Sequence, residues 1–174
     1  MPAKKTVNDA FANIAYMAVT ESAANTLTFA KLEMASNLMT EKAALIIHAA
    51  EIYLNYPSLM DTNGDTLGMA ITLSDRLTTI GDLSQPEILI SFGFGRYDYG
   101  AAASGLLVVR PQKMDFTSMP GGGLLVPADR LYIGVKGSGC SAAGSAIARI
   151  YYTVKLLETA DYWELIEARR IMTT

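Results

Sequence analysis

The sequence contains one cysteine and one histidine, and each scarcity excludes a class of protein. Because Cys140 is the only cysteine among 174 residues, an internal disulfide and a thiol-rich metal site are both excluded. His48 is the only histidine, so the multi-histidine metal sites of cupin-like barrels cannot be assembled. A catalytic triad would have one candidate base. The position of His48 in an alternating run favours a structural role.

Charged residues are scarce as well, and they are not clustered. They make up 18% of the chain, whereas 51% of the residues are hydrophobic, and typical soluble domains are about a quarter charged. This apolar surplus indicates contacts between subunits once one core has been filled. The net charge is −3 and the Lys and Arg residues are scattered. Since neutralising phosphates requires clustered basic residues, we expect no sequence-specific nucleic-acid partner.

Long hydrophobic runs and a leader-like beginning are also missing. The longest apolar candidate, Ala43 to Ile47, is followed at once by His48, far short of the roughly 20 residues of a membrane-spanning helix. Lys4 and Lys5 are not followed by the apolar region of a secretory signal. We therefore expect a protein that is made in a cytosol and has no span across a bilayer.

What the sequence does contain is a series of eight apolar and β-branched runs, separated by clusters of Gly, Pro, Asn and Asp. This spacing is typical of a β-sandwich or barrel, and the length fits one domain. The runs are approximately Asn13 to Thr20, Thr26 to Met34, Ala43 to Leu54, Leu67 to Ser74, Glu87 to Phe94, Gly105 to Arg110, Arg130 to Lys136 and Ser145 to Leu156. We predict an all-β, eight-stranded antiparallel sandwich.

Two segments carry helical signals. Part of Ala24 to Leu54 is an open alternative, because its apolar residues do not strictly alternate and Ala, Met, Glu and Lys favour helices. At the end of the chain, Thr159 is a candidate cap and Asp161 falls in the first turn, which predicts a short C-terminal helix. Its spacing places Tyr162, Leu165 and Ile166 on the docking face, and Glu164, Glu167 and Arg170 in solvent.

One loop has an incomplete calcium signature. Asp61 to Asp65 places three oxygen-bearing side chains at alternate positions, as at the start of a calcium-binding loop. An EF-hand requires Gly at position six and Glu at position twelve, whereas Gly64 and Thr72 stand at positions four and twelve. A plain Asx-type turn is favoured, and whether the loop binds calcium stays open.

The glycine motifs do not complete a nucleotide site. Gly93 to Arg96 begins like a dinucleotide fingerprint, but Asp98 replaces the third Gly and no helix pattern follows. Gly121 to Gly123 lacks the ending of a phosphate loop. We therefore predict no catalytic, cofactor-binding or metal-binding residues, no cofactor and no small-molecule substrate.

The order of the features resembles a known family. A mostly polar arm precedes eight predicted strands, the last of which is followed by a helix. The segments that carry the resemblance are Thr28 to Glu33, Glu41 to His48, Gly123 to Pro127, Leu131 to Val135, Ala148 to Lys155 and Tyr162 to Arg170. In this order they resemble the single jelly-roll capsid proteins of tailless icosahedral viruses of archaea and bacteria, the sphaerolipovirus-like type.

The resemblance implies an eight-stranded antiparallel jelly-roll sandwich with a short C-terminal helix. It divides the chain into an N-terminal arm (1–12), a single jelly-roll domain (13–157) and a C-terminal helix and tail (158–174). It also implies a structural protein of the virion, not an enzyme, which self-assembles into an icosahedral shell as a homo-oligomer. A second capsid protein and an internal membrane beneath the shell occur in such viruses, and the sequence leaves both open.

Two other classes of function stay open beside this one. The first is a β-sandwich binding module that recognises carbohydrate or a protein partner through Tyr97, Tyr99 and Trp163. The second is an enzyme that uses His48 with a carboxylate such as Glu51 or Asp75. The order of the strands favours the coat protein over both.

Overall fold

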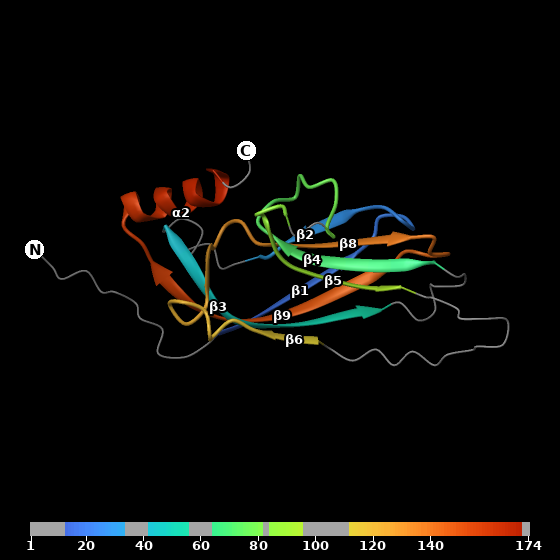
Figure 1. Ribbon diagram of the computed structural model, residues 1–174, viewed down its shortest axis with the longest axis horizontal. Coiled ribbons are helices and arrows are strands. Elements are labelled where there is room, and N and C mark those ends of the chain that lie inside the picture. Colours follow the sequence, from blue (N-terminus) through green and yellow to red (C-terminus); the bar gives the residue numbers. More distant parts are fainter. Residues whose placement is uncertain (1–12, 34–41, 56–63, 82–83, 96–111, 172–174) are drawn as a thin grey trace, which may run out of the picture.

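The fold was taken from a computed structural model, which describes residues 13–33, 42–55, 64–81, 84–95 and 112–171. Two antiparallel sheets lie face to face, with one helix at an end of the sandwich (Figure 1). In chain order the elements are β1 (Asn13–Thr20), β2 (Thr28–Lys31), β3 (Ala43–Asn55), β4 (Thr66–Thr72), β5 (Ile88–Gly95), β6 (Gln112–Asp115), β7 (Leu124–Pro127), β8 (Tyr132–Ser138), β9 (Ser145–Leu156) and α2 (Thr159–Ile171).

The strand order is that of a jelly roll. One sheet has the order β1-β9-β3-β6, with β7 also paired to β3, and the other has the order β2-β8-β4-β5. β6 pairs with Ala49–Ile52 and β7 with Ala44–Ile47, on the edge of β3 opposite β9. They are therefore two halves of one interrupted edge strand, and each sheet has four strand positions. The predicted all-β antiparallel sandwich is confirmed, and the described residues form nine strands that fill these eight positions.

Alternate residues of each strand point between the sheets and form the core. In β9, Ala148 and Ile150 are buried while Arg149, between them, is exposed. The largest fully buried side chains come from both sheets: Leu45, Ile47, Ile52, Leu54, Leu67, Met69, Ile71, Val126, Leu131, Ile133 and Ile150. Burying one such side chain contributes about 1.5–3 kcal/mol. The strand period thus places most of the stabilising area between the two sheets.

A second, smaller apolar cluster covers the outer face of the β2-β8-β4-β5 sheet. Ile80, from the segment between β4 and β5, is buried there with Ala70, and Phe29 packs against them. Gly134 of β8 lies beneath this cluster, where an added Cβ would come within 2.6 Å of the Phe29 ring. A glycine is needed here because the aromatic ring lies directly on the backbone.

Two features of the sandwich differ from the sequence prediction. The open helical alternative in Ala24 to Leu54 is wrong for the described residues, which form β2 and β3 there. β6 and β7 were not predicted, because Gln112–Asp115 is mostly polar and Leu124–Pro127 is short and ends in proline. The predicted run Gly105 to Arg110 lies outside the described residues. The C-terminal helix is confirmed as α2.

No helix in the described ranges is both long and apolar enough to cross a membrane.

Candidate interaction surfaces

The outer face of the β1-β9-β3-β6 sheet carries a row of side chains, one from each strand. The register places Tyr16 opposite Arg149, Arg149 opposite Glu51, and Glu51 opposite Lys113. Arg149 Nη1 donates to Glu51 Oε2 at 3.4 Å. Opposite charges on neighbouring strands stabilise a sheet modestly. The charges of this row therefore lie on β9, β3 and β6, and none lies on β1.

Tyr151 lies beside this row, two residues after Arg149 on the same face of β9. The Lys113 ammonium lies 6.0 Å from the centroid of the Tyr151 ring, at the outer limit of a cation–π contact. A hydrogen bond with the Tyr151 side chain, and after it Glu51, raises the pKa of Arg149. The guanidinium therefore stays charged and is held by neighbours from two strands.

Toward β1 the same face becomes apolar. Ile14 is 62% exposed and Tyr16 is 61% exposed, while their neighbour Met17 is buried in the core. Two large apolar side chains, two residues apart on one strand, thus stand in solvent. Scattered exposed apolar residues are normal, but here they sit on an edge strand, where the backbone of a neighbour can approach.

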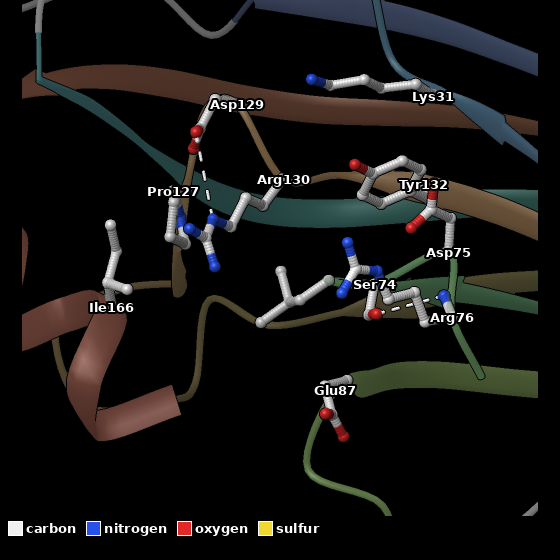
Figure 2. Close-up of a pocket in the computed structure, with 11 residues that line it drawn as sticks. Lys31, Ser74, Asp75, Arg76, Glu87, Pro127, Asp129, Arg130, Tyr132 and Ile166 are labelled. Atoms are coloured by element: carbon white, nitrogen blue, oxygen red, sulfur yellow. Dashed lines mark hydrogen bonds and ion pairs between the residues drawn. The ribbon is translucent and has the colours of Figure 1, made fainter. Parts of the chain in front are cut away.

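A cleft of about 490 Å³ opens at the end of the sandwich near α2. Figure 2 shows Ile166 of α2 facing the same cleft as Pro127 and Arg130. The charged side chains that line it are balanced, with Lys31, Arg76 and Arg130 against Asp75, Glu87 and Asp129. Because three basic and three acidic groups share the cleft, its electrostatics favour neither an anion nor a cation strongly.

Asp129 connects α2 to the sandwich at this cleft. The Tyr162 hydroxyl donates to Asp129 Oδ1 at 2.9 Å, and Arg130 Nε lies 3.9 Å from Asp129 Oδ2 (Figure 2). Burial, followed by the hydrogen bond to Asp129, raises the pKa of Tyr162 to about 12. The phenol therefore keeps its proton and its bond at neutral pH. Ile166 is buried, so the predicted docking face of the helix is confirmed at this residue.

Tyr132 forms the opposite wall of the cleft. The Lys31 ammonium lies 5.9 Å from the centroid of its ring. Burial raises the pKa of Tyr132, and the nearby charges of Asp75 and Asp129 add to this effect. The cleft thus combines an aromatic ring with mixed charges, and its walls come from both sheets and α2.

His48 occupies a bulge in β3. The register between β3 and β9 shifts between Ile47 and Ala49, which leaves His48 outside the ladder. Its Nδ1 lies 2.9 Å from the Gly122 carbonyl oxygen, and its Nε2 lies 3.1 Å from Thr153 Oγ1. With the proton on Nδ1, the ring donates to Gly122 and accepts from the threonine hydroxyl. Both nitrogens thus have structural partners.

The hydrogen bonds of His48 reach Gly122 and Thr153, and none of the other candidate catalytic or binding residues that the structure describes is among its partners. Glu51 pairs with Arg149, and Asp75 lines the cleft near α2. Trp163 is 54% exposed on α2. Tyr97, Tyr99 and most of the Asp61 to Asp65 loop lie outside the described residues, although Asp65 itself is buried. Among the residues that the structure describes, no three His, Cys, Asp or Glu side chains form a group that could hold a metal ion.

The cleft and the exposed pair on β1 were not found from the sequence. Asp129 and Tyr162 are 33 residues apart, so no local spacing signals their bond. The exposure of Ile14 and Tyr16 could not be predicted, because alternating apolar residues indicate that one face of a strand is buried. The alternation does not indicate which strand lies at the edge of a sheet. The strand order of the folded protein supplies that information.

Comparisons with known proteins add little to this description. No protein-family model matches the chain, and no curated protein matches it in sequence. A chain from the structure of Desmodium yellow mottle tymovirus is similar at 12% identity and a TM-score of 0.33, covering 86% of this chain and 90% of that one. A chain from the three-dimensional structure of maize chlorotic mottle virus is similar at 10% identity and a TM-score of 0.27, covering 84% of this chain and 95% of that one.

The strand order alone therefore defines the class of protein. The chain is an all-β sandwich of the jelly-roll type, with a short C-terminal helix at one end (Figure 1).

Proposed function

We propose that the protein is a coat subunit that self-assembles into an icosahedral viral shell. The observation that supports this most is the strand order, β1-β9-β3-β6 facing β2-β8-β4-β5. Double-sheet jelly rolls of this kind recur in viral capsid domains, lectins and cupins. The single histidine at a structural position is unlike the multi-histidine sites of the cupins, and the sequence resemblance favours the capsid class.

The surface of the sandwich supports an assembling protein. Its outer β1 face exposes Ile14 and Tyr16, and the same sheet carries charged side chains further from its edge. Interfaces between proteins combine such apolar centres with a polar surround. A shell subunit needs several contacts of this type, and β1, the cleft and the exposed Trp163 of α2 are the described surfaces that fit them.

The finer proposal follows the sphaerolipovirus-like resemblance. Residues 1–12 form an arm, residues 13–157 the jelly-roll domain, and residues 158–174 the helix and tail. Subunits join into larger capsomers in the virion, after synthesis in the cytoplasm of the host. The protein has a structural role without enzymatic activity, and the proposal leaves open both a second capsid protein and an internal membrane beneath the shell.

A non-enzymatic binding module is the alternative, and the cleft at α2 is the observation that favours it. Tyr132 and the mixed charges of the cleft offer both stacking and hydrogen bonding to a sugar or a peptide side chain. Such a module predicts a small oligomer whose melting temperature rises with its ligand.

The assembly state of the purified full-length protein tests the proposal. We would measure mass by size-exclusion chromatography with light scattering, and image the same samples by negative-stain electron microscopy across salt and pH. Shells, sheets or capsomer-sized rings are expected. A monomer or dimer that persists at high concentration would contradict self-assembly. A shift in melting temperature on a glycan panel would then support the binding module.

A further inference from the structure

β1 lies at an edge of its sheet in the part of the chain that the structure describes. All eight of its residues, Asn13–Thr20, are in register with Ser145–Tyr152 of β9. No other described strand pairs with β1. The opposite edge of this strand is therefore available to a strand from outside the described sandwich.

The hydrogen-bond phase of β1 shows which residues face the free edge. The backbone N–H of Glu21 donates to the Gly144 carbonyl at 2.9 Å, and these two residues continue the register of Thr20 with Ser145. In an antiparallel ladder hydrogen-bonded pairs alternate with non-bonded pairs. The N–H and C=O groups of Ile14, Tyr16 and Ala18 therefore point away from β9, toward the free edge.

β1 lacks the devices that protect an edge from pairing. Sheet edges are commonly protected by charged residues, proline, bulges or short length. The sequence of β1, NIAYMAVT, contains no charge and no proline, and its register with β9 has no shift.

The other three edges of the sandwich differ from β1. β2 has only four residues. The edge formed by β6 and β7 is interrupted and contains Lys113 and Pro127. β5 has a register shift against β4 and two glycines. β1 is thus the edge best suited to accept another strand.

We propose that β1 pairs antiparallel with β1 of a second copy of this chain, about a two-fold axis at Tyr16. Tyr16 then lies opposite its own equivalent, and Ile14 lies opposite the small Ala18. Aromatic pairs across strands stabilise a sheet, and the two exposed apolar side chains of each copy become covered. This pairing specifies one contact of the proposed shell. The choice of a second copy of the chain as the partner rests on the proposed function.

Electrostatics favours a second copy over a charged partner strand. β1 itself is uncharged, so self-pairing places no like charges opposite one another. The nearest charge in the row, Arg149, lies on β9, and its equivalent in the second copy is three strand spacings away, about 14 Å. This exceeds the Debye length of about 8 Å at physiological salt, so the two guanidinium groups repel one another weakly.

Cysteine cross-linking tests both the pairing and its register. In Tyr16→Cys the two Cα atoms across the axis lie about 5.5 Å apart, within the range of a disulfide. The matched control, Ala18→Cys, lies on the same strand and face, but its two copies are offset by four residues, about 14 Å. Mild oxidation of the full-length protein should give at least a fivefold larger dimer fraction on a non-reducing gel for Tyr16→Cys. The native Cys140 is buried and is common to both variants.

A second variant measures the interface without a disulfide. Tyr16→Lys introduces a charge at an exposed position, so folding is preserved, and the two lysines would face each other across the axis. Light scattering should show at least a tenfold weaker dimer than for the wild type. Ala160→Lys, on the exposed side of α2, is the control and should leave the dimer unchanged.

The outcomes separate this pairing from the coat proposal. Larger assemblies of the Tyr16→Cys variant that do not cross-link would overturn the pairing and leave the coat proposal standing. Cross-linked dimers that form nothing larger would support the pairing and contradict the coat proposal. Equal cross-linking of both cysteine variants would overturn the axis at Tyr16. A monomeric Tyr16→Cys variant whose introduced thiol fails to react with a maleimide would overturn the pairing as well, because another part of the same chain would then cover the edge.

Discussion

Glu21 and Gly144 are joined by two hydrogen bonds that run in opposite directions. The backbone N–H of Glu21 donates to the Gly144 carbonyl at 2.9 Å, and the backbone N–H of Gly144 donates to Glu21 Oε2 at 2.8 Å. The other carboxylate oxygen, Oε1, accepts from the backbone N–H of Gly137 at 2.7 Å. One buried carboxylate, 4% exposed, thus fixes the start of the β1–β2 connection to Gly137, near the end of strand β8, and to Gly144, the residue before β9.

Replacing this carboxylate should destabilise the fold strongly. Glu21→Ala leaves two buried N–H groups without acceptors, and each such group costs about 1–3 kcal/mol, so we expect a loss of about 2–6 kcal/mol in the free energy of unfolding. Glu21→Gln keeps one acceptor oxygen and should cost less. Urea denaturation followed by circular dichroism measures both. Glu33→Gln, at an exposed acidic residue, is the control, and an effect of Glu21→Ala no larger than that of the control would contradict this role.

Asn25 should contribute through its backbone and its side chain together. Its φ of 64° lies in the left-handed region, which Asn tolerates better than most residues. Its amide side chain also bonds Cys140 twice, accepting from the backbone N–H at 2.9 Å and donating to the carbonyl at 3.0 Å. Asn25→Ala loses both bonds and keeps the strained backbone, so we expect about 2–3 kcal/mol of destabilisation.

The comparison with glycine separates the two contributions of Asn25. Asn25→Gly loses the same two hydrogen bonds but adopts a positive φ freely, so its destabilisation should be about 1 kcal/mol smaller than that of alanine. Differential scanning calorimetry of both variants checks this order. Equal melting temperatures for the two would show that the backbone conformation contributes nothing.

Much of the sandwich could be predicted from the sequence because it depends on local alternation. Ser145 to Leu156 was predicted with the bounds that β9 has, since its period of two is regular and its flanks are rich in small residues. β6 was missed because only Met114 of its four residues is apolar and half-buried. An edge strand that pairs with a partner on one side only does not need the alternating pattern of a core strand.

The contacts of the candidate surfaces could not be predicted, because they join residues that are distant in the sequence. Glu21 lies 123 residues from Gly144, and no pattern in either segment indicates that they meet. The exposure of Tyr16 depends on the position of β1 at the end of the β1-β9-β3-β6 order, which is a property of the topology. His48 was interpreted as a structural residue from its run, but its partners Gly122 and Thr153 come from two other segments, which that run does not indicate.

The close packing at Gly134 should make this position sensitive to a single methyl group. An added Cβ would lie 2.6 Å from one carbon of the Phe29 ring and 3.3 Å from Ile80 Cγ2, so the ring or the strand must shift. Overpacking of this kind costs about 1–3 kcal/mol, and we expect Gly134→Ala to lose that amount in urea denaturation.

A double-mutant cycle identifies the origin of this cost. Phe29→Leu removes the ring that the new methyl group would meet, so Gly134→Ala should be less destabilising in the Phe29→Leu background, with a coupling of about 1 kcal/mol. Gly81→Ala, where an added Cβ meets nothing within 4 Å, is the matched control. Additive effects of Gly134→Ala and Phe29→Leu would contradict the contact.

The bond between Tyr162 and Asp129 should make the stability of the protein depend on alkaline pH. Burial raises the pKa of Tyr162 from 10.0 to about 12 in the folded chain. Between these values the phenol loses its proton in the unfolded chain but keeps it in the folded one. The stabilisation is therefore fully present below pH 10 and is lost as the pH rises through about 12, because unfolding releases a proton in this window.

Tyr162→Phe tests this linkage, because phenylalanine fills the same space without a titrating group. Near neutral pH the variant should melt at a lower temperature than the wild type, because the substitution removes the hydrogen bond to Asp129. Between pH 10 and 12 its melting temperature should fall less steeply than that of the wild type. Tyr132, whose pKa is also raised by burial, keeps part of the slope in both proteins. Glu164→Gln, at an exposed residue of α2, is the control and should follow the wild type. An identical slope for Tyr162→Phe and the wild type would show that α2 is held to the sandwich by its apolar contacts at Ile166 instead of by this hydrogen bond.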